Sequence, residues 1–312
     1  MKKLTIITLA ALLLAACTNT EEQLKQRAAE LCRHIPDHEL REESKDYMTA
    51  DFYAVLDTMF NRLPDHEAMD HEWLYYFVTG NGGTIANYTV TAVELTDDDH
   101  AVATISVRQQ WEDGSFDENT DVEEHRLYME RVDGQWLMSD FDGHKADCIR
   151  HIALSRREEA LRGAIIGYLK DQIGSQYLQG ELCVPTLMMV QEEEQGDSLM
   201  LAWCDCWIYW YNPAGDTLKC ISGGNHSGLF TLRRTGGNLT VTSFDQTTDG
   251  ASFTPSARRI FGPHYDLFCN MHSNADVREA VRREQLRQLI QTQKLPFRYY
   301  QDYGWPAVKI ED

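Results

Sequence analysis

Leu127-Tyr128-Met129-Glu130-Arg131-Val132-Asp133-Gly134-Gln135-Trp136-Leu137-Met138-Ser139-Asp140-Phe141-Asp142 is the stretch that decides the fold. Two segments of alternating apolar and polar residues flank its central Asp-Gly pair. Asp-Gly favours a two-residue β-hairpin turn, because both positions of that turn require positive φ. The stretch therefore predicts an antiparallel hairpin whose strands cover residues 125–132 and 136–141.

The same pattern returns later in the chain. Leu127 to Gly134 aligns with Phe230-Thr231-Leu232-Arg233-Arg234-Thr235-Gly236-Gly237, and the same shift places Phe141-Asp142 on Phe244-Asp245. Matched turns followed by the same Phe-Asp ending indicate a tandem duplication. The alternative is a chance likeness between hairpins of two β-rich domains, since the helices do not share this alignment.

Helical and extended segments surround both hairpins in a similar order. Helical spacing of apolar residues covers 21–34 and 44–63 in the first half, and 155–173 in the second. Alternation predicts strands in each half, and in one of them Ala101, Ala103, Ile105 and Val107 share a face. The expected strands cover 88–95, 101–111, 182–191, 199–211, 217–222, 228–234 and 238–244. The sequence thus predicts an α+β protein with domains at 21–150 and 151–250.

Two short stretches carry a family resemblance. Tyr53-Ala54-Val55-Leu56-Asp57 and Gly134-Gln135-Trp136-Leu137-Met138-Ser139-Asp140-Phe141-Asp142-Gly143 resemble a family of NTF2-like envelope proteins of unknown function. The resemblance covers residues 21–150 and, more loosely, 155–250. It implies two NTF2-like or cystatin-like domains, in which helices pack on curved antiparallel sheets that often leave a pocket. That fold hosts enzymes, transport adaptors and inert modules, so the resemblance implies a scaffold rather than an activity.

Residues 251–312 depart from a plain repeat. Ser273-Asn274-Ala275-Asp276 predicts a capping box that opens a helix, which continues to about Lys294. This helix is rich in arginine, and Pro296 marks its end. An aromatic tail follows. We expect this C-terminal helix and tail to pack on the second domain, or to clamp the two domains together.

The first residues predict export and lipid attachment. Lys2 and Lys3 precede an apolar run that is too short to span a bilayer, so residues 1–16 are expected to be a signal peptide. The run ends in Leu14-Ala15-Ala16-Cys17, which resembles the lipobox of bacterial lipoproteins. In that family the cysteine receives a diacylglycerol and its freed amine is acylated, for example with palmitate. The resemblance implies a lipid-anchored envelope protein with a tether at 17–20.

The resemblance to lipoproteins also indicates which membrane would hold the lipid anchor. Thr18 stands where an Asp retains some lipoproteins at the inner membrane, so the outer membrane is favoured. The membrane, reached through the lipid on Cys17, is then the expected partner. The alternative is an ordinary secreted protein with a chance cysteine at this place.

The charge of the chain limits the classes of partner it can bind, and its cysteines raise the question of disulfides. With 49 acidic against 29 basic residues and a net charge of −20, nucleic acid is excluded as a partner, because phosphate binding needs clustered Lys and Arg. No motif predicts a cofactor. Seven cysteines follow Cys17, in a compartment that permits disulfides, and Cys32 with Cys148 is the pairing to test first.

The most unusual local sequence is Trp203-Cys204-Asp205-Cys206-Trp207-Ile208-Tyr209-Trp210-Tyr211. As a strand it presents Trp203, Asp205, Trp207, Tyr209 and Tyr211 on one face. The aromatic members, Trp203, Trp207, Tyr209 and Tyr211, form a candidate platform for a sugar ring or another flat ligand. The competing interpretation is a central strand covered on both faces.

Other polar clusters are weaker candidates. Cys204, Cys206, Cys220 and His226 lack the two-residue gap typical of zinc ligands, and no metal site is predicted there. His264, Cys269 and His272 lack the third group that orients a Cys–His nucleophile. Acid–base candidates on the predicted fold are His125, Tyr128, Asp140 and Asp245. None of these residues is predicted to be catalytic.

These observations predict a non-catalytic binding module for a small molecule, a glycan or an envelope protein. The alternative is a hydrolase or isomerase with an acid–base residue in an NTF2-like pocket. A third possibility is a purely structural or immunity-type interaction protein.

Overall fold

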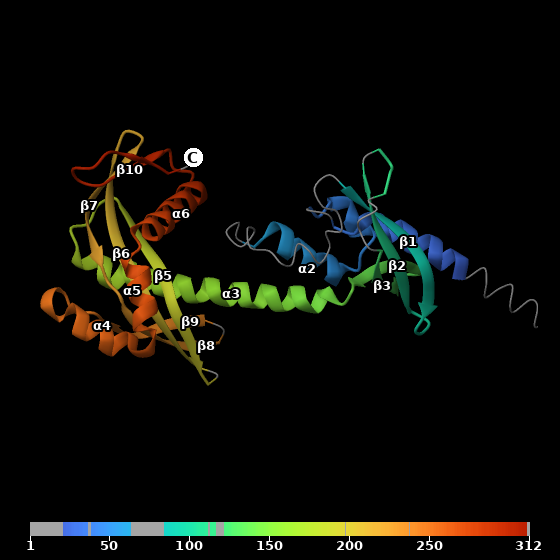
Figure 1. The fold of residues 1–312 in the computed structure, drawn as a ribbon, viewed down its shortest axis with the longest axis horizontal. Coiled ribbons are helices and arrows are strands. Elements are labelled where there is room, and N and C mark those ends of the chain that lie inside the picture. Colours follow the sequence, from blue (N-terminus) through green and yellow to red (C-terminus); the bar gives the residue numbers. More distant parts are fainter. Residues whose placement is uncertain are drawn as a thin grey trace, which may run out of the picture. The chain divides into compact units, whose positions relative to one another are not determined.

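The structure is a computed structural model that describes residues 21–36, 39–63, 84–111, 113–116, 122–196, 198–236 and 238–310. The expected signal peptide, Cys17 and the tether lie outside these residues. The chain is α+β, built from helices and antiparallel sheets (Figure 1). It divides into two compact units, unit 1 ending at Arg156 and unit 2 beginning at Arg157.

Unit 1 is a four-stranded antiparallel meander with helices on one face. A helix over 21–31 and one face of the strand over 101–107 supply its core. The four residues predicted to share that face are all buried: Ala101, Ala103, Ile105 and Val107. The elements are η1 Cys32–His34, η2 Glu42–Asp46, α2 Ala50–Asn61, β1 Thr84–Leu95, β2 His100–Trp111, β3 Glu123–Val132 and β4 Gln135–Phe141.

Helix α2 begins later than the sequence predicts. Its N-cap position is Thr49, whereas Ser44, the N-cap candidate at the start of the predicted helix, lies in the preceding 3-10 turn. The reason is a tertiary contact: the amide of Met138 in β4 donates to the carbonyl of Tyr47, and Thr49 N–H donates back to the Met138 carbonyl. This extended segment covers the free edge of β4 and so cannot be helical.

The hairpin of β3 and β4 forms as predicted. Asp133 and Gly134 have φ of 51° and 82°, the left-handed values that a tight hairpin turn of this type needs. The strands pair Leu127 with Phe141, and both side chains are buried in the core of unit 1.

Unit 2 is organised around the long strand β6, Leu199–Ala214. One edge of β6 pairs with β5 along most of its length, whereas β8 and β7 divide the other edge between its two halves. The expected strands are all present, and β10 adds a parallel pairing to β7. The strands are β5 Leu182–Gln195, β7 Thr217–Asn225, β8 Gly228–Thr235, β9 Asn238–Gln246, β10 Tyr299–Gln301 and β11 Val308–Lys309.

Helices cover both faces of β6 (Figure 1). On one face Cys204, Cys206, Ile208 and Trp210 pack against the second half of α3 and the π-turn η5. On the other face the C-terminal segment packs. The remaining elements are α3 His144–Tyr168, η5 Leu169–Ile173, η6 Gly174–Gln176, η7 Gly250–Ser252, α4 Phe253–Phe261, η8 Gly262–His264, α5 Tyr265–Ser273 and α6 Ala275–Gln293.

The C-terminal helix has a different cap from the one predicted. Asn274, not Ser273, is the N-cap of α6, and its side chain accepts a hydrogen bond from Val277 N–H at 3.2 Å. Ser273 ends α5 instead, because the chain turns between two helices at this point. Among the described residues no helix is both long and apolar enough to cross a bilayer.

Candidate functional site

The four aromatic residues of the predicted platform lie on one face of β6, as expected. Trp203 and Tyr209 each keep 8% of their surface exposed and Tyr211 none, while Trp207 is partly exposed. Trp203 packs against α4 and donates its indole N–H to the Ile260 carbonyl at 2.8 Å. In the structure this face is therefore covered by the protein's own C-terminal helices, which is the competing interpretation of the pattern.

The aromatic rings form a ladder along the strand. Ring centroids of Trp207 and Tyr209 are 6.3 Å apart at an interplanar angle of 10°, and Tyr209 to Tyr211 is again 6.3 Å. Arg278 of α6 lies over the Trp207 ring at 4.7 Å, and Arg282 over Tyr209 at 3.9 Å. The flat groups that stack on this platform are thus guanidinium groups of the same chain, held by cation–π attraction.

The distances between successive residues on α6 and on β6 explain why each arginine lies over one aromatic ring. Residues four apart on a helix are separated by about 6 Å along its axis. Alternate residues of a strand are separated by about 6.6 Å. Arg278 and Arg282 of α6 therefore follow Trp207 and Tyr209 of β6 in step. We name this set, with Tyr211, the arginine–aromatic ladder.

Arg282 is almost fully enclosed within the ladder, with 1% of its surface exposed. Its Nε donates to the Tyr211 hydroxyl at 2.7 Å, and its two terminal nitrogens reach the Asp302 carboxylate at 2.8 and 2.6 Å. This bidentate bond lowers the pKa of Asp302, while burial raises the pKa of Tyr211 well above its usual value. Arg282 thereby ties α6, β6 and the segment after β10 together.

Asp205 is fully buried on the same face, where an unpaired carboxylate would be costly. Its Oδ1 accepts hydrogen bonds from Asn225 Nδ2 at 2.6 Å and Ser227 Oγ at 2.5 Å. Its Oδ2 lies 3.0 Å from Nδ1 of His272 on α5. The sequence places Asp205 on this face but does not show that His272, far along the chain, is its partner.

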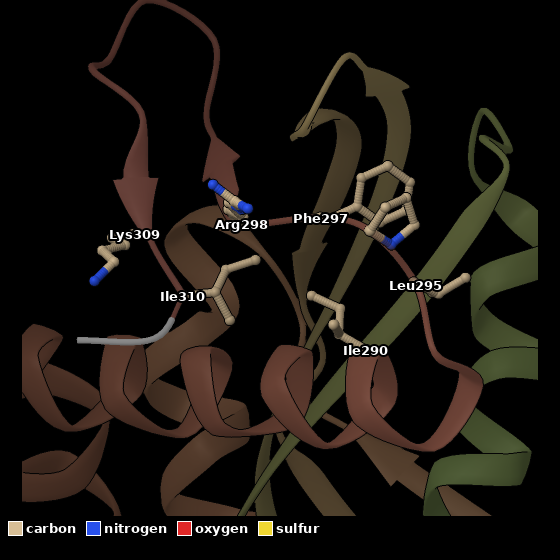
Figure 2. A pocket seen from close by; sticks show the side chains of 7 residues that line it. Ile290, Leu295, Phe297, Arg298, Lys309 and Ile310 are labelled. Carbon is tan, nitrogen blue, oxygen red and sulfur yellow. The ribbon is translucent and has the colours of Figure 1, made fainter.

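Beyond the ladder, apolar residues that pack between α6 and the β10–β11 hairpin line a cavity of about 510 Å³. Figure 2 shows Ile290 on α6 and Ile310, the residue directly after β11. The lining is completed by Leu295, Pro296 and Phe297, with Arg298 and Lys309 on the hairpin side. The lining of this half-open cavity thus combines five apolar residues with two cationic ones.

The two cations lack counter-charges within the described chain. The exposed side chains of Arg298 and Lys309 make no hydrogen bond or ion pair with any described residue. The backbone of Arg298 is nevertheless fixed, since its N–H donates to the Asp216 carbonyl and its carbonyl accepts from Ile310 N–H. Sequence reasoning missed this cavity, because its walls come together only when β10 and β11 pair.

In unit 1, His125 and Tyr128 point to opposite faces of β3, as their spacing requires. His125 lies on the inner side, where its Nδ1 is 2.5 Å from Asp142 Oδ2 and its ring is 5.4 Å from that of Phe141. Asp142 raises the pKa of His125 through this bond. Asp140 instead accepts from the amides of Phe141 and Lys145 at the start of α3, and burial raises its pKa.

The expected cysteine pairing does not form. Cys32 and Cys148 are both free thiols in the core of unit 1, and burial raises the pKa of each to about 12. They contribute as small apolar side chains. A disulfide between them would close the first half on itself, but the sequence does not fix the geometry that two sulfur atoms need to bond.

The second cysteine cluster is divided by the sheet. Cys204 and Cys206 pack on the α3 side, whereas Cys220 packs with the ladder on the opposite side. His226 is hydrogen-bonded through Nε2 to the Tyr177 hydroxyl at 2.7 Å. Across the part of the chain that the structure describes, no group of three His, Cys, Asp or Glu residues is arranged to hold a metal ion.

The third cluster also separates. His264 contacts the Trp203 ring at 4.9 Å and Glu193 at 3.4 Å, while His272 contacts Asp205. Asp245 forms a bidentate pair with Arg259 of α4 at 2.7 and 3.1 Å, which lowers its pKa. Each of these polar residues thus has a different neighbour.

Comparisons with known proteins give little beyond this geometry. No family model matches the chain, and no curated protein matches it. Among solved structures, the chain is similar to an "Ntf2 like protein involved in plasmid conjugation" with a TM-score of 0.20 and 9% identity. The alignment covers 73% of this chain and 98% of that one. A TM-score this low does not establish a common fold.

Proposed function

We propose that this protein is a binding module of the bacterial envelope, anchored by a lipid on Cys17 and built from two NTF2-like or cystatin-like domains. Its ligand is an amphipathic anion, which binds the cavity between α6 and the β10–β11 hairpin. The lipobox-like Leu14-Ala15-Ala16-Cys17 supports the anchoring, and incorporation of labelled palmitate that is lost in Cys17→Ser tests it.

The two closing hairpins support a duplicated domain. Leu127 pairs with Phe141 in β3–β4, and Phe230 pairs with Phe244 in β8–β9, at positions that the sequence alignment makes equivalent. The register shifts after Tyr128 in one hairpin and after Thr231 in the other, which are again equivalent positions. A shared bulge at the same place is more specific than a shared hairpin, because bulges are specific local features of a sheet.

The cavity carries the ligand assignment. A volume of about 510 Å³ is within the range of small-molecule sites. Its five apolar lining residues favour an aliphatic or aromatic body, since burying apolar surface is favourable by about 25 cal/mol per Å². Arg298 and Lys309, which lack partners among the described residues, favour a carboxylate or phosphate head group.

A head-group series tests this assignment. Isothermal titration of the chain from Thr18 onward would compare dodecanoate, dodecyl phosphate, dodecyl maltoside and dodecyltrimethylammonium, each below its micelle concentration. We expect both anions to bind at least tenfold more tightly than the neutral and cationic compounds. Removing both rim charges in Arg298→Gln/Lys309→Gln should abolish this preference while leaving weak apolar binding.

A matched control removes the same charge elsewhere in unit 2. Lys170→Gln/Arg233→Gln changes two exposed cations that do not line the cavity and should bind dodecanoate as the wild type does. Equal affinity for all four head groups, or equal loss in both double variants, would contradict the cavity assignment.

A further inference from the structure

The pair of Asp205 and His272 has an arrangement that packing alone does not require. Asp205 is fully buried in the central strand, and the donors Asn225 and Ser227 occupy its Oδ1. Ser227 Oγ also lies 2.9 Å from Asn225 Oδ1, so the two donors are in contact with each other. The remaining oxygen, Oδ2, is left to hold the imidazole of His272 by its Nδ1 at 3.0 Å.

This contact fixes which nitrogen of His272 is available. A carboxylate can only accept hydrogen bonds, so the neutral imidazole places its proton on Nδ1 and its lone pair on Nε2. Nε2 makes no hydrogen bond to any described residue, and the side chain keeps 28% of its surface exposed. The outer nitrogen is therefore an oriented, solvent-accessible base.

The surroundings of His272 are aromatic. The rings of Phe268, Phe253 and Trp207 lie 5.1, 5.4 and 6.4 Å from the imidazole, centroid to centroid. The Trp207 ring is nearly parallel to the imidazole, at 22°. Such walls favour a flat, conjugated molecule, because aromatic groups gain from stacked and edge contacts as well as from burial.

Arg278 and the indole N–H of Trp207 are two polar groups without a hydrogen-bonded or ion-paired side-chain partner among the described residues. The Arg278 guanidinium lies over the Trp207 ring but forms no ion pair with a carboxylate of the described chain. The indole N–H of Trp207 is buried and has no acceptor among the described residues, which is unfavourable for a polar group. An anion would supply the counter-charge that Arg278 lacks.

We propose that His272, positioned by Asp205, is a general base that removes a proton from carbon in a planar, conjugated anion whose acid group binds Arg278. Nε2 forms the new N–H bond as the C–H bond breaks. The electron pair of that bond forms a π bond, and the bond to the leaving group breaks with its electrons on the leaving group. The imidazolium then returns its proton to water, so the elimination needs no other reactant.

The probe is 5-nitrobenzisoxazole, a flat carbon acid that a base opens to a coloured nitrophenolate. With the chain from Thr18 onward we expect a rate well above that of free imidazole at equal concentration. His272→Gln should lower this rate by about 10²-fold, the contribution typical of a positioned base. The matched control is His264→Gln, in the same C-terminal segment, which should keep the wild-type rate.

Two further measurements separate catalysis from a structural role. Asp205→Asn should lower the rate while leaving His272 in place, because the imidazole is no longer held in the tautomer that exposes the lone pair of Nε2. Benzoate should inhibit the wild type more strongly than benzamide does, and Arg278→Gln should remove that difference. Near-ultraviolet circular dichroism shows whether each variant is folded.

The outcomes are distinct. Loss of rate in folded His272→Gln but not in His264→Gln supports the proposal. A wild type no faster than imidazole, or a folded His272→Gln as fast as the wild type, overturns it. Neither result depends on Arg298 and Lys309, so the experiments test this site and the cavity independently.

Discussion

Strands β2 and β6 are central strands of their two sheets, yet they are buried differently. In β2, buried and partly exposed residues alternate from Ala101 to Val107, so one face meets the core and the other faces outward. In β6 nearly every residue from Ala202 to Tyr211 is buried. Both strands pair with neighbours on each side, so hydrogen bonding does not explain the difference.

The difference comes from what covers the second face. Unit 2 carries helices α4 to α6 after its closing hairpin, and these pack on the outer face of β6. The outer face of β2 bears Thr104 and Ser106, which tolerate water, whereas that of β6 bears the aromatic rings of the ladder. Similar hairpin frames therefore support a one-sided sheet in unit 1 and a two-sided sheet in unit 2.

The largest effect is expected when one tyrosine is replaced in each unit, on β6 and on β3. Tyr211→Ala removes a fully buried ring from β6 and should lower the free energy of unfolding of unit 2 by about 3–5 kcal/mol. Tyr128→Ala removes a partly exposed ring from the outer face of β3 and should cost less than about 1 kcal/mol. Urea denaturation measures the loss, with amide hydrogen exchange to assign it to each unit. Equal losses would show that β6 is not covered as described.

A smaller effect is expected from Arg282, which binds the cover to the sheet. Arg282→Met should destabilise unit 2 by about 2–3 kcal/mol, because it leaves Tyr211 and Asp302 without their donor, although water can reach the partly exposed Asp302. Arg287→Met is the control on the same helix. Arg287 pairs with Glu284 near the surface, so its loss should cost less than about 1 kcal/mol. Exchange protection in α6 should fall only in the first variant.

The smallest effect distinguishes the two hairpins by pH. The bond to Asp142 raises the pKa of His125 above 6.5, so its stabilisation is complete below 6.5 and is lost as pH rises through the folded value. Burial raises the pKa of Asp142, but the bonds from His125 and the Arg126 amide outweigh it and hold the pKa below 3.8. That stabilisation is present above 3.8 and is lost as pH falls. The pair therefore stabilises β3–β4 most between these values, by about 1.5 kcal/mol.

The equivalent hairpin of unit 2 supplies the control within one sample. Asp245 pairs with Arg259, which stays charged at every accessible pH, so β8–β9 should lose protection only on the acid side. Hydrogen exchange across pH 3 to 9, corrected for intrinsic rates, compares the two hairpins directly. His125→Gln should remove the alkaline loss in β3–β4, and a loss that persists in this variant would assign it to another group.

Much of the fold was predictable because it depends on local patterns. Alternation placed the strands, and Asp133-Gly134 placed a turn whose φ values almost no other residue pair tolerates. The helix caps were less predictable. Ser44 and Ser273 have the right chemistry for N-caps, but β4 and the turn after α5 impose other boundaries. A cap is chosen by the path of the chain as well as by the residue.

The candidate sites were only partly predictable. The aromatic face of β6 follows from a period of two, but the sequence did not identify Arg278 and Arg282 as the groups that stack on it. The cavity walls come from α6, β11 and the segment between them, and His272 meets Asp205 across 67 residues of chain. No periodicity reports such pairings, because they depend on how helices dock on the sheet.

By itself, therefore, the sequence determined the strands, the two hairpins, the aromatic face and the acidic surface, because each depends on residues close together in the chain. Only the tertiary structure decided that the aromatic face is covered, that Cys32 and Cys148 stay as thiols, and that Arg298 and Lys309 flank a cavity. These outcomes depend on distances between remote segments, which are set by the packing of whole elements.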